Sequence, residues 1–222
     1  MPVLADWYDV LQERADTRHL AVVLARYVTG SASAMGSRNE IDLDNKYIVI
    51  DTSGMPDDLL LPGIFWATDI ANDLISGAGG QLSALISDEL WSLVGANSNP
   101  LAAGYIQEMV KTIRGLGGIA ITSTQGMQDL FSLDNGKYGK GILDSSRIKI
   151  VMQMEEQEAR LIQNVLNLSE EEVRQITRFR RGEGLLCIGY NHVPIAFYAT
   201  QKEYDAITTS PTDLLKRKER EA

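Results

Sequence analysis

Two adjacent carboxylates, Asp88 and Glu89, directly follow an apolar run over residues 82–87. A short apolar run of this kind, with turn residues before it, is typical of a buried strand. Carboxylates at the C-terminal end of a parallel strand lie at the edge of an open α/β sheet where ligands bind. There an aspartate can hold the magnesium ion that bridges nucleotide phosphates, and a glutamate can orient or deprotonate a water. The plain alternative is a strand that ends in two solvated acids.

Thr124 and Gln125 end the next predicted strand, over residues 118–123. If the two strands are neighbours, these side chains emerge at the same sheet edge as the carboxylates. A glutamine in that place can hydrogen-bond both a water and a γ-phosphate, which would couple the state of a nucleotide to the protein. Without such neighbours, an exposed glutamine at a strand end carries no function.

Arginines at two places offer positive charge that a phosphate could use. Arg114 precedes the strand over residues 118–123, and a guanidinium there can neutralise charge on a transferring phosphate, including one in a neighbouring subunit. It suits the negative C-terminal end of a helix equally well. The cluster of Arg178, Arg180 and Arg181 has the same two interpretations and a third, a small contact with DNA phosphates.

A helix is predicted between the two edge strands. Asn99 and Pro100 suit its N-cap and first helical position, and Gly115 suits the position just past its end. Residues spaced by four along its predicted buried face are Leu101, Tyr105, Met109 and Ile113.

The rest of the chain also alternates between helices and strands. Further helices are predicted over residues 4–26, 61–75 and 155–166, and strands over 46–51, 147–154, 184–190 and 194–200. Ser169 with Glu172 predicts a capping box for another short helix, and the last two strands predict a hairpin around Asn191 and His192. Strands separated by helices imply βαβ units, so the predicted fold class is α/β with a mainly parallel sheet.

The composition of the 222 residues disfavours several classes of protein. No stretch approaches the roughly 20 apolar residues of a membrane helix, and the N-terminus lacks the pattern of a signal peptide, so we expect an intracellular protein. The net charge of −9 argues against a broad nucleic-acid-binding face. Cys187 lies in an apolar run and is expected to be a small buried hydrophobe. His19 and His192 lack ligands at metal spacing, so no zinc site is predicted.

Two runs around these residues resemble the motor ATPases of conjugation and type IV secretion. The run Ala-Leu-Ile-Ser-Asp-Glu-Leu-Trp over 84–91 is similar to their Walker B motif, and the run over 113–125, which ends in Ser-Thr-Gln, is similar to their glutamine motif. The similarity extends from about residue 30 to residue 211, through the segments 29–31, 45–51, 179–186, 194–197 and 208–211. These proteins include the motors of conjugative transposons and are relatives of the hexameric RecA-like DNA pumps.

The resemblance implies a RecA-like P-loop NTPase core, with a C-terminal hairpin, that uses ATP and Mg²⁺ in the intact protein. It implies that Asp88 is the magnesium-directed carboxylate and Glu89 the catalytic base, and that Gln125 senses the γ-phosphate beside Thr124. Arg114 would be a finger offered to the adjacent subunit. The implied partners are other subunits, as a hexamer, and membrane channel components, with a cytoplasmic location or a peripheral one at the inner face of the membrane.

The chain departs from that family in one respect. Its sequence contains no Gly-x-x-x-x-Gly-Lys-Ser/Thr run, whose backbone amides and lysine cradle phosphates. The Gly-Lys pairs within residues 135–141 lack a following Ser or Thr, and residues 77–80 are a plain turn. We therefore interpret residues 1–222 as one partial ATPase domain, with a helical segment over 1–29 and a solvated tail over 212–222.

These observations leave two main hypotheses and a third, weaker one. The first is a portion of an ATP-hydrolysing motor that is inactive, without bound nucleotide, when this chain is alone. The second is a non-hydrolysing binding module that docks on a motor or channel. The third is a protein that handles nucleic acid through Arg178, Arg180 and Arg181, which the acidic net charge disfavours. The cargo of the motor, DNA or protein, stays open.

Overall fold

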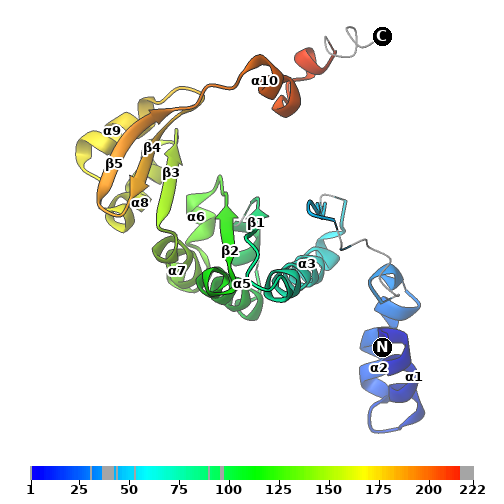
Figure 1. The fold of residues 1–222 in the computed structure, drawn as a ribbon. Coiled ribbons are helices and arrows are strands. Elements are labelled where there is room, and N and C mark those ends of the chain that lie inside the picture. The colour runs from blue at the N-terminus through cyan, green and yellow to red at the C-terminus, as the bar shows by residue number, and fades with distance from the viewer. Residues whose placement is uncertain are drawn as a thin grey trace.

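The computed structural model describes residues 2–30, 32–36, 43, 45–52, 54–89, 91–95 and 98–215. Helices and strands alternate through it, so the predicted α/β class is confirmed (Figure 1). Strands β1 (Ser83–Ser87) and β2 (Gly118–Thr122) pair in parallel. Strands β3 (Ile148–Met152), β4 (Glu183–Ile188) and β5 (Asn191–Ala196) form an antiparallel sheet in that order. Among the described residues, parallel pairing is therefore limited to β1 and β2, because β3 joins the C-terminal hairpin.

The N-terminal segment forms two helices rather than the single helix predicted over residues 4–26. Helix α1 (Leu4–Glu13) ends because Arg14 has an extended backbone, and α2 (Arg18–Val28) begins after Thr17, whose hydroxyl donates to the Leu11 carbonyl at 3.0 Å. A short 3₁₀ turn, η1 (Ser33–Gly36), follows. Figure 1 shows the pair of helices α1 and α2 lying apart from the sheets. It buries little of its own apolar surface, since Ala21 is the one residue of the two helices that is buried.

The prediction of a strand over residues 46–51 is wrong. These residues have no regular secondary structure, and Tyr47 and Val49 are exposed. A strand is stabilised by ladder hydrogen bonds to a neighbour, and no described strand pairs with this segment. Helix α3 (Asp57–Gly77) follows and contains the helix predicted over residues 61–75.

Helices between β1 and β3 form one buried cluster. They are α4 (Trp91–Val94), α5 (Pro100–Thr112), α6 (Met127–Leu130) and α7 (Lys137–Ser145), with 3₁₀ turns η2 (Ile113–Leu116) and η3 (Leu133–Gly136). Asn99 caps α5 as predicted, because its side chain accepts from the Leu101 amide at 2.8 Å. The cluster contains Leu93, Val94, Ala103, Ile106, Leu130, Tyr138 and Ile142.

Two details of the helix after Asn99 differ from the prediction. Of the predicted buried face, Met109 and Ile113 are buried, but Leu101 is 83% exposed. Ala103 and Ile106 are also buried, so the buried stripe is shifted at the start of the helix. The chain leaves η2 at Gly117, which has φ 82°, rather than at Gly115. Glycine adopts this left-handed conformation without the clash that a Cβ atom causes.

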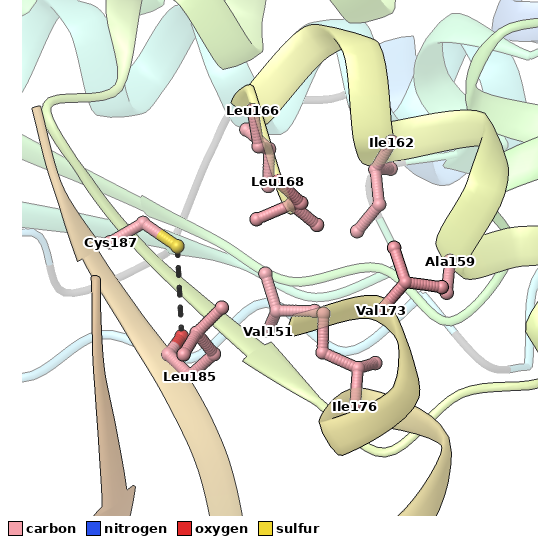
Figure 2. Packing of buried hydrophobic residues seen from close by; sticks show 9 residues of the cluster. All are labelled: Val151, Ala159, Ile162, Leu166, Leu168, Val173, Ile176, Leu185 and Cys187. Atoms are coloured by element: carbon pink, nitrogen blue, oxygen red, sulfur yellow. Dashed lines mark hydrogen bonds between the residues drawn. The ribbon is translucent and has the colours of Figure 1, made fainter. Parts of the chain in front are cut away.

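The C-terminal unit packs α8 (Glu156–Leu166) and α9 (Glu170–Arg178) on one face of the antiparallel sheet. Figure 2 shows its core, which consists of Val151, Ala159, Ile162, Leu166, Leu168, Val173, Ile176, Leu185 and Cys187. The predicted capping box of Ser169 and Glu172 begins α9. Cys187 is buried as predicted, and burial raises the pKa of its thiol.

The end of the chain is close to the prediction. The hairpin turns at Gly189 and Tyr190, not at Asn191 and His192, because Gly189 takes up the left-handed φ of 61° that a tight turn needs. Helix α10 (Gln201–Ile207) follows, and residues 211–215 are helical again. Most of the predicted tail, from residue 216 onward, lies outside the described residues. Over the part of the chain that is described, no helix is long and apolar enough to cross a membrane.

One face of the parallel pair is bare. Along β1 and β2 the exposed residues alternate with half-buried ones, so Ala84, Ile86, Ile119 and Ile121 share the exposed face. The three isoleucines are between 50% and 67% exposed. Parallel sheets are normally covered on both faces, so this face is an apolar surface without a described cover.

Candidate functional site

The predicted site residues of β1 and β2 meet at one edge of the sheet. Ser87 and Thr122 are the last paired residues of the two parallel strands. Pairing continues one step further, since the Ser123 amide donates to the Ser87 carbonyl at 3.0 Å. Asp88 and Glu89 therefore leave β1 beside the residues that leave β2, as the sequence predicted.

Asp88 is held by two hydrogen bonds to the same carboxylate oxygen. Its Oδ1 atom accepts from the Ser123 hydroxyl and from the Glu89 amide, the latter at 3.0 Å. Asp88 Oδ2 accepts no hydrogen bond from the described part of the chain. The carboxylate is exposed, so its second oxygen faces solvent at the sheet edge.

Glu89 reaches the same side of the edge through an unusual backbone conformation. Its φ is 53°, in the left-handed region that costs a non-glycine residue roughly 1–2 kcal/mol. The conformation is supported by Ser92, whose amide and hydroxyl both donate to the Glu89 carbonyl, at 3.0 and 2.8 Å. Gln125 Nε2 donates to Glu89 Oε1 at 2.7 Å. The predicted proximity of Gln125 and the carboxylates is therefore confirmed.

Thr124 lies between the two residues that bind the carboxylates. Its hydroxyl oxygen is buried and has no hydrogen-bond partner among the residues that the structure describes. A buried hydroxyl without a partner costs about 1–3 kcal/mol, and such groups concentrate where a ligand or water completes the network. The unpaired hydroxyl is thus an observation that a bound group at this edge would explain.

The predicted arginines do not join this cluster. Arg114 is exposed in η2, which precedes β2, so it lies at the opposite edge of the parallel pair from Asp88. Arg178 ends α9, and Arg180 and Arg181 lie in the turn before β4; all three are exposed. The Arg180 amide donates to Glu183 Oε2 at 2.8 Å, which is a turn contact.

The edge residues suit a magnesium ion that is also bound by phosphates, rather than a metal ion held by protein ligands alone. No group of three or more His, Cys, Asp or Glu side chains that could hold a metal occurs among the described residues. Magnesium in nucleotide sites takes one or two carboxylates and completes its shell with phosphate oxygens and waters. Asp88 and the neighbouring hydroxyls supply oxygen ligands of that kind, and phosphates would have to supply the rest.

Sequence reasoning missed Ser123 and the conformation of Glu89. A signal for Ser123 was available, because it stands two residues before Gln125 and alternate strand residues share a face. No local pattern indicates a left-handed backbone at a glutamate, a residue that rarely adopts one.

The carboxyl end of parallel strands on an α/β scaffold, where these carboxylates and the glutamine lie, is where such folds bind ligands. The TraG P-loop domain family matches residues 6–215 of the sequence. The chain belongs to that family.

Solved structures agree with the fold. VirB4 of Thermoanaerobacter pseudethanolicus is similar with a TM-score of 0.78 and 24% identity, over 91% of this chain and 56% of that chain. The genome packaging NTPase B204 from Sulfolobus turreted icosahedral virus 2, in complex with ATP-gammaS, is similar with a TM-score of 0.52 and 17% identity, over 73% of this chain and 74% of that chain. No curated protein sequence matches the chain.

Proposed function

We propose that this chain is the Walker B portion of an ATP-hydrolysing motor that powers transfer of DNA or protein through a conjugation or type IV secretion channel. The observation that carries the proposal is the cross-strand bonding of Asp88 to Ser123 and of Glu89 to Gln125 at one sheet edge, in a member of the TraG P-loop domain family. The chain spans 56% of the length of the VirB4 chain, so the activity of a whole motor is itself part of the proposal.

Each edge residue has a role in this proposal. Asp88 holds Mg²⁺, which when bound neutralises charge on the β- and γ-phosphates. Glu89 orients the attacking water and accepts its proton. Gln125, whose amide nitrogen donates to Glu89 Oε1 at 2.7 Å, senses the γ-phosphate. Through this hydrogen bond, binding of the phosphate would alter the position of the glutamate. Thr124 offers its unpartnered hydroxyl to a phosphate oxygen.

Arg114 belongs to the proposal as a residue that acts on another subunit. It lies at the sheet edge opposite to its own carboxylates, so it has no role in its own site. An exposed guanidinium there supports a finger offered to the nucleotide of an adjacent subunit, in a homo-oligomer that the family resemblance makes a hexamer. The cluster of Arg178, Arg180 and Arg181 is a second, weaker proposal for contact with DNA phosphates.

ATP and Mg²⁺ are proposed for the intact motor and not for this chain alone. The sequence contains no Gly-x-x-x-x-Gly-Lys-Ser/Thr run, so a phosphate cradle must come from other polypeptide. The bare apolar face of β1 and β2 supports this, because it offers a surface for such a segment to cover. We propose a cytoplasmic location, at the inner face of the membrane where channel components bind the motor.

The same two observations favour an alternative. A chain without a phosphate cradle, with an uncovered apolar sheet face, could be a non-hydrolysing module that docks on a motor or channel. In that case the edge residues are retained by the fold without being used.

ATP hydrolysis by the intact parent protein tests the first proposal. We expect Glu89→Gln to lower kcat by roughly 10²–10⁴-fold, the usual contribution of a general base. Glu108→Gln, at an exposed glutamate of α5, is the matched control and should leave kcat unchanged. Normal hydrolysis by the Glu89 variant would overturn the catalytic role. Reading the coding DNA upstream of Met1 separates the two proposals: an in-frame phosphate loop supports the motor, and a stop codon with a ribosome site supports the module.

A further inference from the structure

Ser123 lies at the edge of the parallel pair with Asp88, Glu89 and Gln125, and its hydroxyl donates to Asp88. It follows the last paired residue of β2, and its amide extends the ladder to the Ser87 carbonyl. Beyond the end of β2, Ser123 and Gln125 are exposed and hydrogen-bond the carboxylates, while Thr124 between them has its hydroxyl buried. The chain leaving β2 therefore presents two hydrogen-bond donors to the chain leaving β1.

The left-handed backbone of Glu89 explains how two adjacent carboxylates meet these two donors. In an extended strand, neighbouring side chains point to opposite faces. With φ at 53°, Glu89 departs from this alternation, and its side chain lies on the same side as that of Asp88. Ser123 then binds Asp88, and Gln125 binds Glu89. A strained conformation that persists because its surroundings determine it is typical of functional sites.

The two carboxylate oxygens of Asp88 consequently differ in their hydrogen bonding. Oδ1 accepts from the Ser123 hydroxyl on one strand and from the Glu89 amide on its own strand. Two donors on one oxygen restrict the rotation of the carboxylate and leave Oδ2 without a hydrogen bond from the described residues. Without the hydroxyl, a single short-range contact from the adjacent residue would remain, and the carboxylate could turn about its Cβ–Cγ bond.

We propose that Ser123 is a positioning residue for Asp88: its hydroxyl holds Oδ1 so that Oδ2 points to a divalent cation. The inference rests on the proposed function, which gives Asp88 its metal. Residues that orient a metal ligand from behind typically contribute about 10–100-fold to metal affinity. Threonine keeps the hydroxyl, so Ser123→Thr should retain what Ser123→Ala loses.

The test has two readouts, and its probe is Mn²⁺. The first readout is the Mn²⁺ concentration that half-saturates the intact parent protein with ATP bound, followed by electron paramagnetic resonance, because phosphates would supply the remaining ligands. The second, without metal, is the hydrogen-exchange rate of the Glu89 amide, which donates to Asp88 Oδ1. We expect Ser123→Ala to weaken Mn²⁺ binding by about tenfold and to speed that exchange, and Ser123→Thr to restore both. Ser83→Ala is the matched control at the other end of β1 and should change neither.

The outcomes separate this inference from the proposed function. If Mn²⁺ binding depends on Asp88, as Asp88→Asn reveals, but Ser123→Ala changes neither readout, the positioning role is wrong and the metal role stands. If Mn²⁺ does not bind at Asp88 at all, the metal role and the positioning role toward a cation both fall. Faster exchange of the Glu89 amide in Ser123→Ala would then show only that Ser123 holds the carboxylate.

Discussion

The C-terminal unit and the parallel pair of strands are built in opposite ways. In the C-terminal unit, α8 and α9 cover one face of β3–β5, and residues such as Ile176 and Val173 are almost completely buried. In the parallel pair, all five residues of β1 are half-buried or exposed, and β2 buries only Gly118. Polar contacts differ too: Glu172 supports a helix N-terminus, whereas Asp88 and Glu89 bind across strands at an open edge.

This difference indicates that stability and chemistry reside in different regions of the chain. Buried apolar area is the dominant stabilising contribution to folding, and the C-terminal unit has a compact cluster of it (Figure 2). The edge of the parallel pair instead holds a left-handed glutamate and a buried hydroxyl without a partner, both of which cost stability. Costs of this kind are typical of a site that is completed by a ligand.

Truncation in the C-terminal core should have the largest effect on stability. Ile176 is fully buried at 0% exposure, so we expect Ile176→Ala to lower the free energy of unfolding by about 2–5 kcal/mol. Leu101→Ala, at 83% exposure in α5, should change it by less than about 0.5 kcal/mol. Urea unfolding followed by circular dichroism measures both. Equal effects of the two variants would contradict the assignment of the stabilising core.

Removing the hydroxyl of Thr124 should raise the free energy of unfolding rather than lower it. Thr124→Val keeps the shape of the side chain and removes the buried oxygen, so we expect the free energy of unfolding to rise by about 1 kcal/mol. Thr68 is the control, because its hydroxyl is buried in α3 but donates to the Ile64 carbonyl at 2.7 Å. Thr68→Val should not stabilise. A loss of stability in Thr124→Val, by the same urea measurement, would show that the hydroxyl is satisfied in solution.

The pH dependence of stability should show that a carboxylate of the C-terminal unit, Glu172, stabilises the fold. Burial of Glu172 raises its pKa, but hydrogen bonds from the Ser169 amide and hydroxyl, together with His192 at 2.7 Å, outweigh it and leave the pKa below the usual value. A lowered folded-state pKa means that this stabilisation is complete above the unfolded pKa of about 4.3. It is lost as the pH falls through the folded value.

Glu172→Gln should therefore lower stability at neutral pH and flatten the acid limb of the stability curve. Thermal unfolding of the variant and the parent at several pH values below 6 measures this difference. Glu171→Gln is the control, since Glu171 is exposed and forms an ion pair with Arg174 on the surface of α9. If Glu172→Gln and the parent lose stability in parallel on acidification, the capping box does not set the acid limb.

Much of the fold around the site could be predicted because it depends on local features of the sequence. The short apolar run before Asp88, the cap at Asn99 and the capping box at Ser169 depend on neighbouring residues in the chain, and each was found where the sequence predicted it. The meeting of Gln125 with the carboxylates followed from one further rule, that consecutive strands of a βαβ unit tend to be neighbours.

Other features depended on contacts between distant segments. Residues 46–51 have the β-branched composition of a strand, but none of the described strands pairs with them, so composition alone misled. Likewise β3 reads as a further strand of a parallel sheet, yet its described neighbour is the antiparallel β4. A strand prediction says which residues are extended and not which neighbour supplies the hydrogen bonds.

Local sequence patterns were enough to predict the α/β class, most of the helices and strands, and the carboxylates and glutamine that meet at one sheet edge. These follow from hydrophobic periodicity and capping, which act over a few residues. Contacts between distant segments, by contrast, bring Ser123 to Asp88 and Gln125 to Glu89, and place Arg114 at the opposite edge. These contacts depend on strand register and on backbone conformation at one residue, and both are set by packing between segments about 35 residues apart in the chain.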